Sequence, residues 1–154
     1  KVEELLISQK KHIKVFADDN GQDLLASGEV KLCQEWNGDI KQIISEDDDV
    51  AYVVPTEGSL LWQDTLAIPA GAPHPENAHA FINYILDPKV GAALSNFNQY
   101  ATPNKAAKEF ITPADLANTA IYPPPEQMEK LQAVMDLGDD EKMYSEVWTQ
   151  VRSE

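Results

Sequence analysis

The stretch AYVVPTEGSLLWQDTLAIPAGAPHPENAHAFINYILDP, residues 51–88, decides the fold class that the sequence predicts. Residues 51–55 and 60–68 are apolar runs bounded by proline and glycine, which is typical of buried strands. From residue 76 to 86 the apolar positions recur at helical spacing, and the Asp-Pro pair that follows is expected to end the helix. Strands followed by a helix in this order indicate an α/β protein.

The rest of the chain continues this alternation. The elements expected outside the stretch are a helical face at residues 2–6, strands at 13–16 and 30–36, helices at 22–26, 40–44, 126–137 and 139–152, and a helix start at Thr112-Pro113. Gly28 is placed to close the helix at 22–26 as a left-handed cap. Because only a few strands are visible, the chain reads as part of a sheet rather than a complete one.

Length and charge limit the classes of partner. The 154 residues are 43% hydrophobic and 25% charged, which is ordinary globular composition. The chain has 12 Lys and Arg against 26 Asp and Glu, a net charge of −14, so nucleic acid and an anionic membrane surface are not expected partners. The acidity suits a cationic ligand, or serves only solubility. No apolar run is long enough to span a bilayer, and the charged opening of the chain does not resemble a signal peptide.

Residues that could carry catalysis or bind a metal are few. Cys33 is the only cysteine, which excludes an intrachain disulfide and a cysteine-based zinc site. His74 and His79 are five residues apart and so do not share one helical face, and the acidic run at 46–49 lacks the calcium-loop pattern. Hydrolase, phosphate-loop, dinucleotide and zinc-protease motifs are missing. The sequence therefore predicts no catalytic residue, no metal and no cofactor.

Two tryptophans each lie beside an aspartate near the end of a predicted strand. Trp36 and Asp39 are three residues apart at a turn, and Trp62 and Asp64 are two apart, which would place both on one side of a strand. An indole face attracts a cation by roughly 0.5–2 kcal/mol, and a charge-assisted hydrogen bond to a carboxylate adds roughly 1.5–3 kcal/mol. The four residues suit an amine ligand; core tryptophans beside turn or cap aspartates are the alternative.

Seven short motifs occur in an order and spacing that point to one protein family. They are residues 23–30, Trp-Asn-Gly-Asp at 36–39, Pro-Thr-Glu-Gly at 55–58 leading to Trp-Gln-Asp at 62–64, and residues 67–69, 81–88 and 100–107, with Tyr122-Pro123 and a helix containing Trp148 closing the series. In this order they resemble the C-terminal half of the spermidine/putrescine-binding proteins. These are two-lobed solute receptors of polyamine ABC importers, with the type II periplasmic binding fold. The resemblance covers nearly the whole chain.

The resemblance implies an architecture and partners. It implies a partial type II periplasmic-binding-protein fold, in which residues 1–60 end the second lobe, 61–120 return to complete the first lobe, and 121–154 form C-terminal helices. It also implies a periplasmic location, putrescine or spermidine as ligand, and the membrane permease of an ABC transporter as partner. The N-terminal half of the same receptor would be a further partner, and no nucleic acid is expected.

The resemblance also implies residue roles. Trp36 and Trp62 would stack on the ligand, Asp39 and Asp64 would bind its amino groups, and Tyr100 would line the cleft. Glu35, at a position that is usually small or apolar in the family, would either add an acid at the cleft or face solvent, and we favour the second. The alternatives are a receptor of the same fold for another solute, an interaction or sensor protein without transport, and a small hydrolase.

Overall fold

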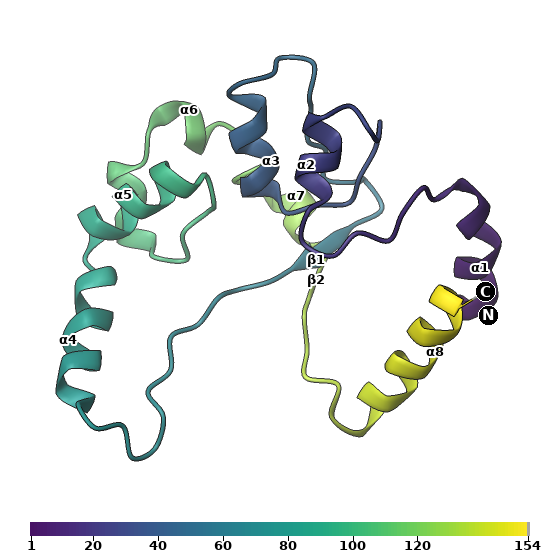
Figure 1. The fold of residues 1–154 in the computed structure, drawn as a ribbon. Helices are drawn as coiled ribbons and strands as arrows, with labels where there is room; N and C mark the ends of the chain where they lie inside the picture. Colours follow the sequence, from purple (N-terminus) through teal and green to yellow (C-terminus); the bar gives the residue numbers. More distant parts are fainter. Residues whose placement is uncertain (154) are drawn as a thin grey trace. The chain divides into compact units, whose positions relative to one another are not determined.

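The computed structural model describes residues 1–153, which fall into two units (Figure 1). The terminal unit consists of residues 1–34 together with the described chain from residue 134 onward. The central unit is Glu35–Ala133. The chain thus leaves the terminal unit once and returns to it, and each unit has its own internal packing.

The central unit is organised around a pair of parallel strands. It contains α3 (Asn37–Ile44), β1 (Ser59–Leu61), α4 (Pro75–Ile85), α5 (Pro88–Asn98), the 3-10 helix η2 (Lys105–Phe110), α6 (Pro113–Leu116), α7 (Pro125–Met128) and β2 (Leu131–Ala133). In the parallel pairing, Ser59 lies opposite Leu131 and Leu61 lies opposite Ala133. The long connection between the two strands carries the helices α4 to α7, as a parallel crossover requires.

The segment before β1 is held against the segment before β2. The side chain of Gln127 donates a hydrogen bond to the carbonyl of Val54 at 2.8 Å, and Lys130 Nζ donates to the carbonyl of Thr56 at 2.7 Å. Gly58 has a φ of +129°, and a Cβ there would lie 2.6 Å from the carbonyl oxygen of Lys130. Only glycine combines this backbone conformation with so close an approach, so the entry into β1 depends on it.

The core of the central unit lies between α5 and η2. Ala92 of α5 is buried against Ala107 of η2 and Ile111, and the ring of Tyr122 packs on them. On α3, Ile40 is almost completely buried. Small residues on α5 therefore allow η2 to pack closely beside it.

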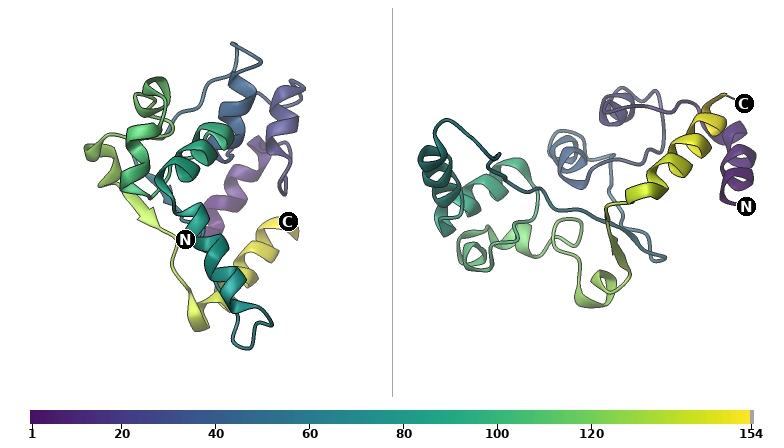
Figure 2. Two further views of the ribbon diagram at one scale, coloured as in Figure 1. Left: turned by 90° about the vertical axis from the view of Figure 1, so that its left-hand side faces the viewer. Right: turned by 90° about the horizontal axis from the view of Figure 1, so that it is seen from below.

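The terminal unit joins the two ends of the chain. It contains α1 (Val2–Gln9), the 3-10 helix η1 (Lys10–His12), α2 (Gly21–Ala26), the 3-10 helix η3 (Gly138–Asp140) and α8 (Glu141–Ser153). Figures 1 and 2 show α1 beside α8, where Lys10 Nζ donates to the carbonyl of Arg152 at 3.1 Å. Val151 is fully buried, and the rings of Phe16 and Trp148 meet edge to face at 5.2 Å.

Several expected elements are confirmed. The helix at 22–26 is α2, and Gly28 follows it with a φ of +71°, as a left-handed cap requires. The helical face at 40–44 belongs to α3, and the helix at 76–86 is α4. Thr112 caps α6 by accepting a hydrogen bond from the amide of Asp115. The last expected helix is α8.

The expected strands are mostly wrong. Residues 13–16, 30–36 and 51–55 are not strands in the described structure, and of residues 60–68 only the first two belong to β1. A strand forms only where a neighbouring segment pairs with its backbone, and among the described residues only β1 and β2 pair. Apolar alternation alone supplies no such neighbour.

The expected helix at 126–137 is also wrong. Helix α7 ends at Met128, and Leu131–Ala133 pairs with β1 instead of continuing the helix. The pairing outweighs the helical spacing of the apolar residues, since tertiary contacts override local propensity. Helix α5 follows α4 directly and was not expected from the sequence.

Within the described residues, no helix combines the length and apolar character that crossing a membrane requires.

Asp87 links α4 to α5 and generates a stability prediction. Its carboxylate accepts hydrogen bonds from the amides of Lys89 (2.9 Å) and Val90 (3.2 Å) at the start of α5. Replacing Asp87 by Ala removes this cap and is expected to lower the free energy of unfolding by about 1 kcal/mol, measured by urea denaturation. Asp87→Asn keeps the acceptor and should stay within a few tenths of a kcal/mol of the wild type. Equal destabilisation by both variants would contradict the capping role.

Candidate ligand-binding site

Three aromatic rings of the central unit form one connected group, the aromatic cluster of Trp36, Trp62 and Tyr100. The ring centroids of Trp36 and Trp62 are 5.2 Å apart at an interplanar angle of 77°. Those of Trp62 and Tyr100 are 5.4 Å apart at 76°. Both contacts are edge to face, a geometry that contributes about 0.5–1.5 kcal/mol beyond burial. Trp62 is therefore the central ring, and its position depends on both neighbours.

The three rings come from three different elements. Trp36 precedes α3 with an extended backbone (φ −66°, ψ 135°). Trp62 directly follows β1, at the carboxyl end of a parallel strand. Tyr100 follows α5, where Gln99 takes the left-handed conformation at φ 61° and turns the chain. In open α/β folds, ligands bind at the carboxyl ends of parallel strands, and the cluster lies at such an end.

The backbone of Tyr100 is fixed on both sides. Its amide donates a hydrogen bond to the side-chain oxygen of Asn98 at 3.0 Å, and its carbonyl accepts one from the hydroxyl of Ser95. Ser95 is buried within α5. The ring of Tyr100 is thus attached to a rigid helix end rather than to a free loop.

The electrostatic environment of Tyr100 includes two acidic residues. Burial raises the pKa of the Tyr100 hydroxyl above its ordinary value, and the charge of Asp39 and a hydrogen bond with its carboxylate raise it further. A hydrogen bond with the backbone amide of Asp39 lowers the pKa, and the charge of Glu35, the smallest of these effects, raises it. Burial, followed by the charge of Glu35, also raises the pKa of Tyr52. Both tyrosines therefore stay neutral to a higher pH than an exposed tyrosine does, and their hydroxyls can donate hydrogen bonds to acids.

Glu35 is partly buried, which favours the expectation of an acid near the site over that of a side chain that only faces solvent. Its carboxylate accepts a hydrogen bond from the amide of Trp36 at 3.0 Å, and its charge acts on Tyr52 and Tyr100. The sequence signal was its place directly before Trp36. It adds a second carboxylate near the aromatic cluster.

The structure brings together four of the five residues expected at the site. Trp36, Trp62 and Tyr100 are in ring contact, and Asp39 interacts with Tyr100. Asp64 is exposed in the segment after β1, two residues beyond Trp62. The strand alternation expected to align Trp62 with Asp64 does not apply, because β1 ends at Leu61.

The arrangement is suited chemically to an organic cation. Trp36 keeps 47% of its surface exposed, so its ring is available to a ligand. Indole rings attract cations, and the nearby carboxylates of Glu35 and Asp39 accept hydrogen bonds from ammonium groups. An anion would meet repulsion at the same place.

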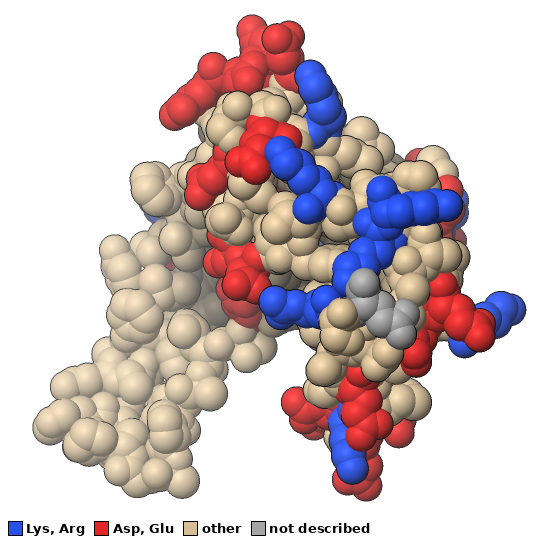
Figure 3. Space-filling model, turned by 45° about the vertical axis from the view of Figure 1, so that its right-hand side comes forward, with Lys and Arg blue, Asp and Glu red and all other residues tan. Residues whose placement is uncertain are grey.

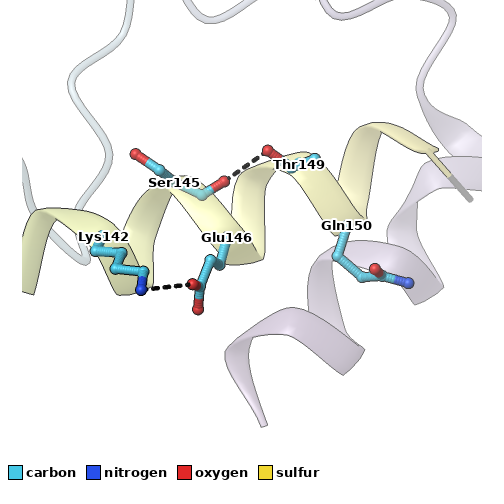
Figure 4. A pocket seen from close by; sticks show the side chains of 5 residues that line it. All are labelled: Lys142, Ser145, Glu146, Thr149 and Gln150. Atoms are coloured by element: carbon cyan, nitrogen blue, oxygen red, sulfur yellow. Dashed lines mark hydrogen bonds and ion pairs between the residues drawn. The ribbon is translucent and has the colours of Figure 1, made fainter.

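The pocket on α8 does not bring together side chains from several elements as the aromatic cluster does. The pocket in Figure 4 is lined by five side chains of α8 alone: Lys142, Ser145, Glu146, Thr149 and Gln150. Lys142 pairs with Glu146 at 3.8 Å, and the hydroxyl of Thr149 donates to the carbonyl of Ser145 at 2.8 Å, so these groups satisfy one another. In the part of the chain that the structure describes, no group of three or more His, Cys, Asp or Glu side chains is placed to hold a metal ion.

Acidic and basic side chains lie close to one another over much of one face. Figure 3 shows acidic and basic residues interspersed over the upper and right-hand parts of the visible face, while its lower left part shows none. A net charge of −14 carried by such surface side chains favours solubility. The acids near the aromatic cluster are a small part of it.

A parallel strand pair connected through helices, with aromatic and acidic residues at a strand's carboxyl end, is the arrangement in which open α/β folds bind ligands. The family of bacterial extracellular solute-binding proteins matches residues 1–124. The chain belongs to this family, which confirms the resemblance seen in the sequence.

Individual relatives support the same conclusion. The chain is 33% identical over 150 residues to spermidine/putrescine-binding periplasmic protein 1 of Haemophilus influenzae, covering 97% of this chain and 42% of that protein. A structure from Listeria monocytogenes matches with a TM-score of 0.86 at 28% identity, covering 98% of this chain and 47% of that one. The spermidine/putrescine ABC transporter substrate-binding protein PotD of Streptococcus pneumoniae matches with a TM-score of 0.79 at 27% identity, over 97% and 47% of the two chains.

The chain spans less than half the length of these relatives. The α/β class and the partial periplasmic-binding-protein fold are confirmed. The relatives are solute-binding proteins of transport systems rather than enzymes.

The environment of Tyr100 generates a pH prediction. In an absorbance titration of tyrosine ionisation, Tyr100 is expected to ionise above the ordinary value of about 10. Asp39→Asn removes the negative charge and should lower the pKa of Tyr100 toward that value, while burial keeps it raised. Tyr100→Phe should abolish the late phase that Tyr100 contributes, whereas Tyr52→Phe should leave it in place.

The same shift has a consequence for stability. A tyrosine whose pKa is raised by folding stabilises the folded state fully below its unfolded pKa, and this contribution is lost as the pH rises through the folded pKa. Unfolding free energy should therefore fall above about pH 10 in the wild type and fall less steeply in Tyr100→Phe. An identical slope in the two proteins would contradict the assignment.

Proposed function

We propose that this chain is part of the solute-binding component of a polyamine ABC import system and binds putrescine or spermidine. The observation that carries the proposal is the contact of Trp36, Trp62 and Tyr100 in one aromatic cluster with Asp39 beside it. Relatives named for spermidine and putrescine binding support the choice of ligand class.

The proposed mode of binding uses both parts of a polyamine. The flat rings of Trp36 and Trp62 form walls for the methylene chain and attract its ammonium groups. Asp39 and Asp64 accept hydrogen bonds from the amino groups, and Tyr100 lines the cleft between them. The spacing of the carboxylates would then discriminate between polyamines of different length.

The chain would supply only part of a larger site. We infer that the N-terminal half of the same receptor completes it, because the chain spans 42–47% of the relatives' lengths. Uncovered apolar side chains agree with a further packing partner: Phe81 is 56% exposed, Tyr84 61% and Phe97 84%. In this arrangement residues 1–60 end the second lobe, 61–120 complete the first lobe and 121–154 form C-terminal helices.

The proposed mechanism is capture rather than catalysis. The complete receptor closes around the ligand in the periplasm, because the ligand contacts both lobes only in the closed form. The closed form is then presented to the membrane permease. A flexible polyamine loses rotational freedom on binding, and the preformed rings of the aromatic cluster reduce the additional ordering that the protein must undergo.

The site assignment is tested by affinity in the complete receptor that contains this sequence. Trp36→Ala and Asp64→Asn are each expected to raise the Kd for putrescine or spermidine roughly tenfold or more, measured by calorimetry. The matched controls are Trp148→Phe, outside the aromatic cluster, and Asp48→Asn in the acidic loop, which should leave Kd unchanged. Unchanged affinity in both site variants would contradict the assignment. Preferential stabilisation by another organic cation in a thermal-shift assay would favour a different solute.

The dependence on a second half generates a separate prediction. The 154-residue chain alone is expected to bind putrescine at least about a hundredfold more weakly than the complete receptor, because losing half of the contacts removes several kcal/mol of binding energy. Calorimetry on both proteins in the same buffer measures the difference. Equal affinity would show that residues 1–154 hold the whole site.

A further inference from the structure

Gly38 occupies a position where the helix alone would favour another residue. It is the second residue of α3 and is buried. Glycine is less favourable than alanine within a helix, because it loses more backbone freedom on folding. Its backbone does not lie in the left-handed region, so conformation does not demand glycine there.

Glycine is required at position 38 because there is no space for a side chain. A Cβ at Gly38 would overlap the Cδ2, Cε2 and Cζ atoms of the Tyr100 ring, well inside the 3.0 Å that side chains respect. The ring of Tyr100 therefore lies flat on the first turn of α3, in the volume that any other residue at position 38 would fill.

The ring of Tyr100 cannot move away from α3 by a shift of its own backbone. The amide and carbonyl of Tyr100 are bound by Asn98 and Ser95 of α5. A side chain at position 38 would therefore force the ring to rotate about its own side-chain bonds. Rotation would move the hydroxyl away from Asp39 and the ring away from Trp62, whose centroid is 5.4 Å distant.

We propose that Gly38 is a positioning residue of the ligand site: by lacking a side chain, it lets Tyr100 hold Trp62 in ring contact and keep its hydroxyl at Asp39. The role in ligand binding rests on the proposed function, whereas the role in ordering the cluster does not. Gly38 sets how closely Tyr100 approaches α3, and so the width available to an organic cation between Tyr100 and the tryptophans.

The test is a double-mutant cycle in the complete receptor. Gly38→Ala is expected to raise the Kd for putrescine roughly fivefold or more and to change the near-ultraviolet circular dichroism of the tryptophans without ligand. It should also lower the pH at which Tyr100 ionises, because the hydroxyl leaves Asp39. In a Tyr100→Leu background, where a flexible side chain replaces the ring, Gly38→Ala should change Kd and dichroism little.

Gly91→Ala is the matched control. Gly91 is also a buried helical glycine, but a Cβ there would meet its nearest atom, the carbonyl oxygen of Ile85, at 3.4 Å. This substitution should leave dichroism, tyrosine ionisation and affinity close to the wild type. An effect as large as that of Gly38→Ala would overturn the proposal, because it would show a general cost of losing a helical glycine.

The remaining outcomes separate the two proposals. In one outcome, Gly38→Ala changes the dichroism, Tyr100→Leu suppresses that change, and the receptor binds no polyamine. This outcome supports the role of Gly38 and refutes the proposed function. Wild-type dichroism and affinity in Gly38→Ala overturn the role of Gly38 while polyamine binding stands. If the Gly38→Ala variant does not fold, the steric explanation requires that the double variant Gly38→Ala with Tyr100→Leu folds. Failure of the double variant to fold would refute the steric explanation.

Discussion

Residues 59–61 and 131–133 lie side by side as parallel strands, although the chain between them carries α4, α5, α6 and α7. Backbone groups in a strand need hydrogen-bond partners, and in the central unit this one pairing supplies them across the long connection. It fixes the start of the segment that contains Trp62, and the contacts of Gln127 and Lys130 with the chain before β1 reinforce it. The position of the central ring of the aromatic cluster therefore depends on residues far away in the sequence.

The aromatic cluster shows how local chemistry and distant packing combine. The extended backbone before α3 presents Trp36, the end of β1 presents Trp62, and the left-handed turn at Gln99 presents Tyr100. Edge-to-face contacts then make the three side chains mutually dependent. Asp39 and Glu35 place negative charge near these rings, and the Tyr100 hydroxyl, whose pKa burial raises, interacts with Asp39. Such a combination favours organic cations over anions.

Helices with strong local signals were predictable from the sequence. Proline at the first position and a capping Thr112 specify α6, and Gly28 specifies the end of α2, because these devices act within a few residues. Strands were not predictable in the same way. Residues 30–36 and 51–55 have strand-like composition, yet composition cannot supply a paired neighbour. Residues 131–133 have helical spacing in sequence and become a strand because β1 lies beside them.

For the site, the sequence by itself determined the residue types and their pairing along the chain: Trp36 with Asp39, and Trp62 with Asp64. Those pairs, together with the order of the motifs, were enough to indicate the family to which the chain belongs. Only the tertiary structure decided that the two tryptophans and Tyr100 form one cluster, that Glu35 is partly buried near it, and that Gly38 leaves room for the Tyr100 ring. The physical reason is that ring contacts, burial and steric exclusion arise between residues distant in sequence, and no local pattern encodes the distance between them.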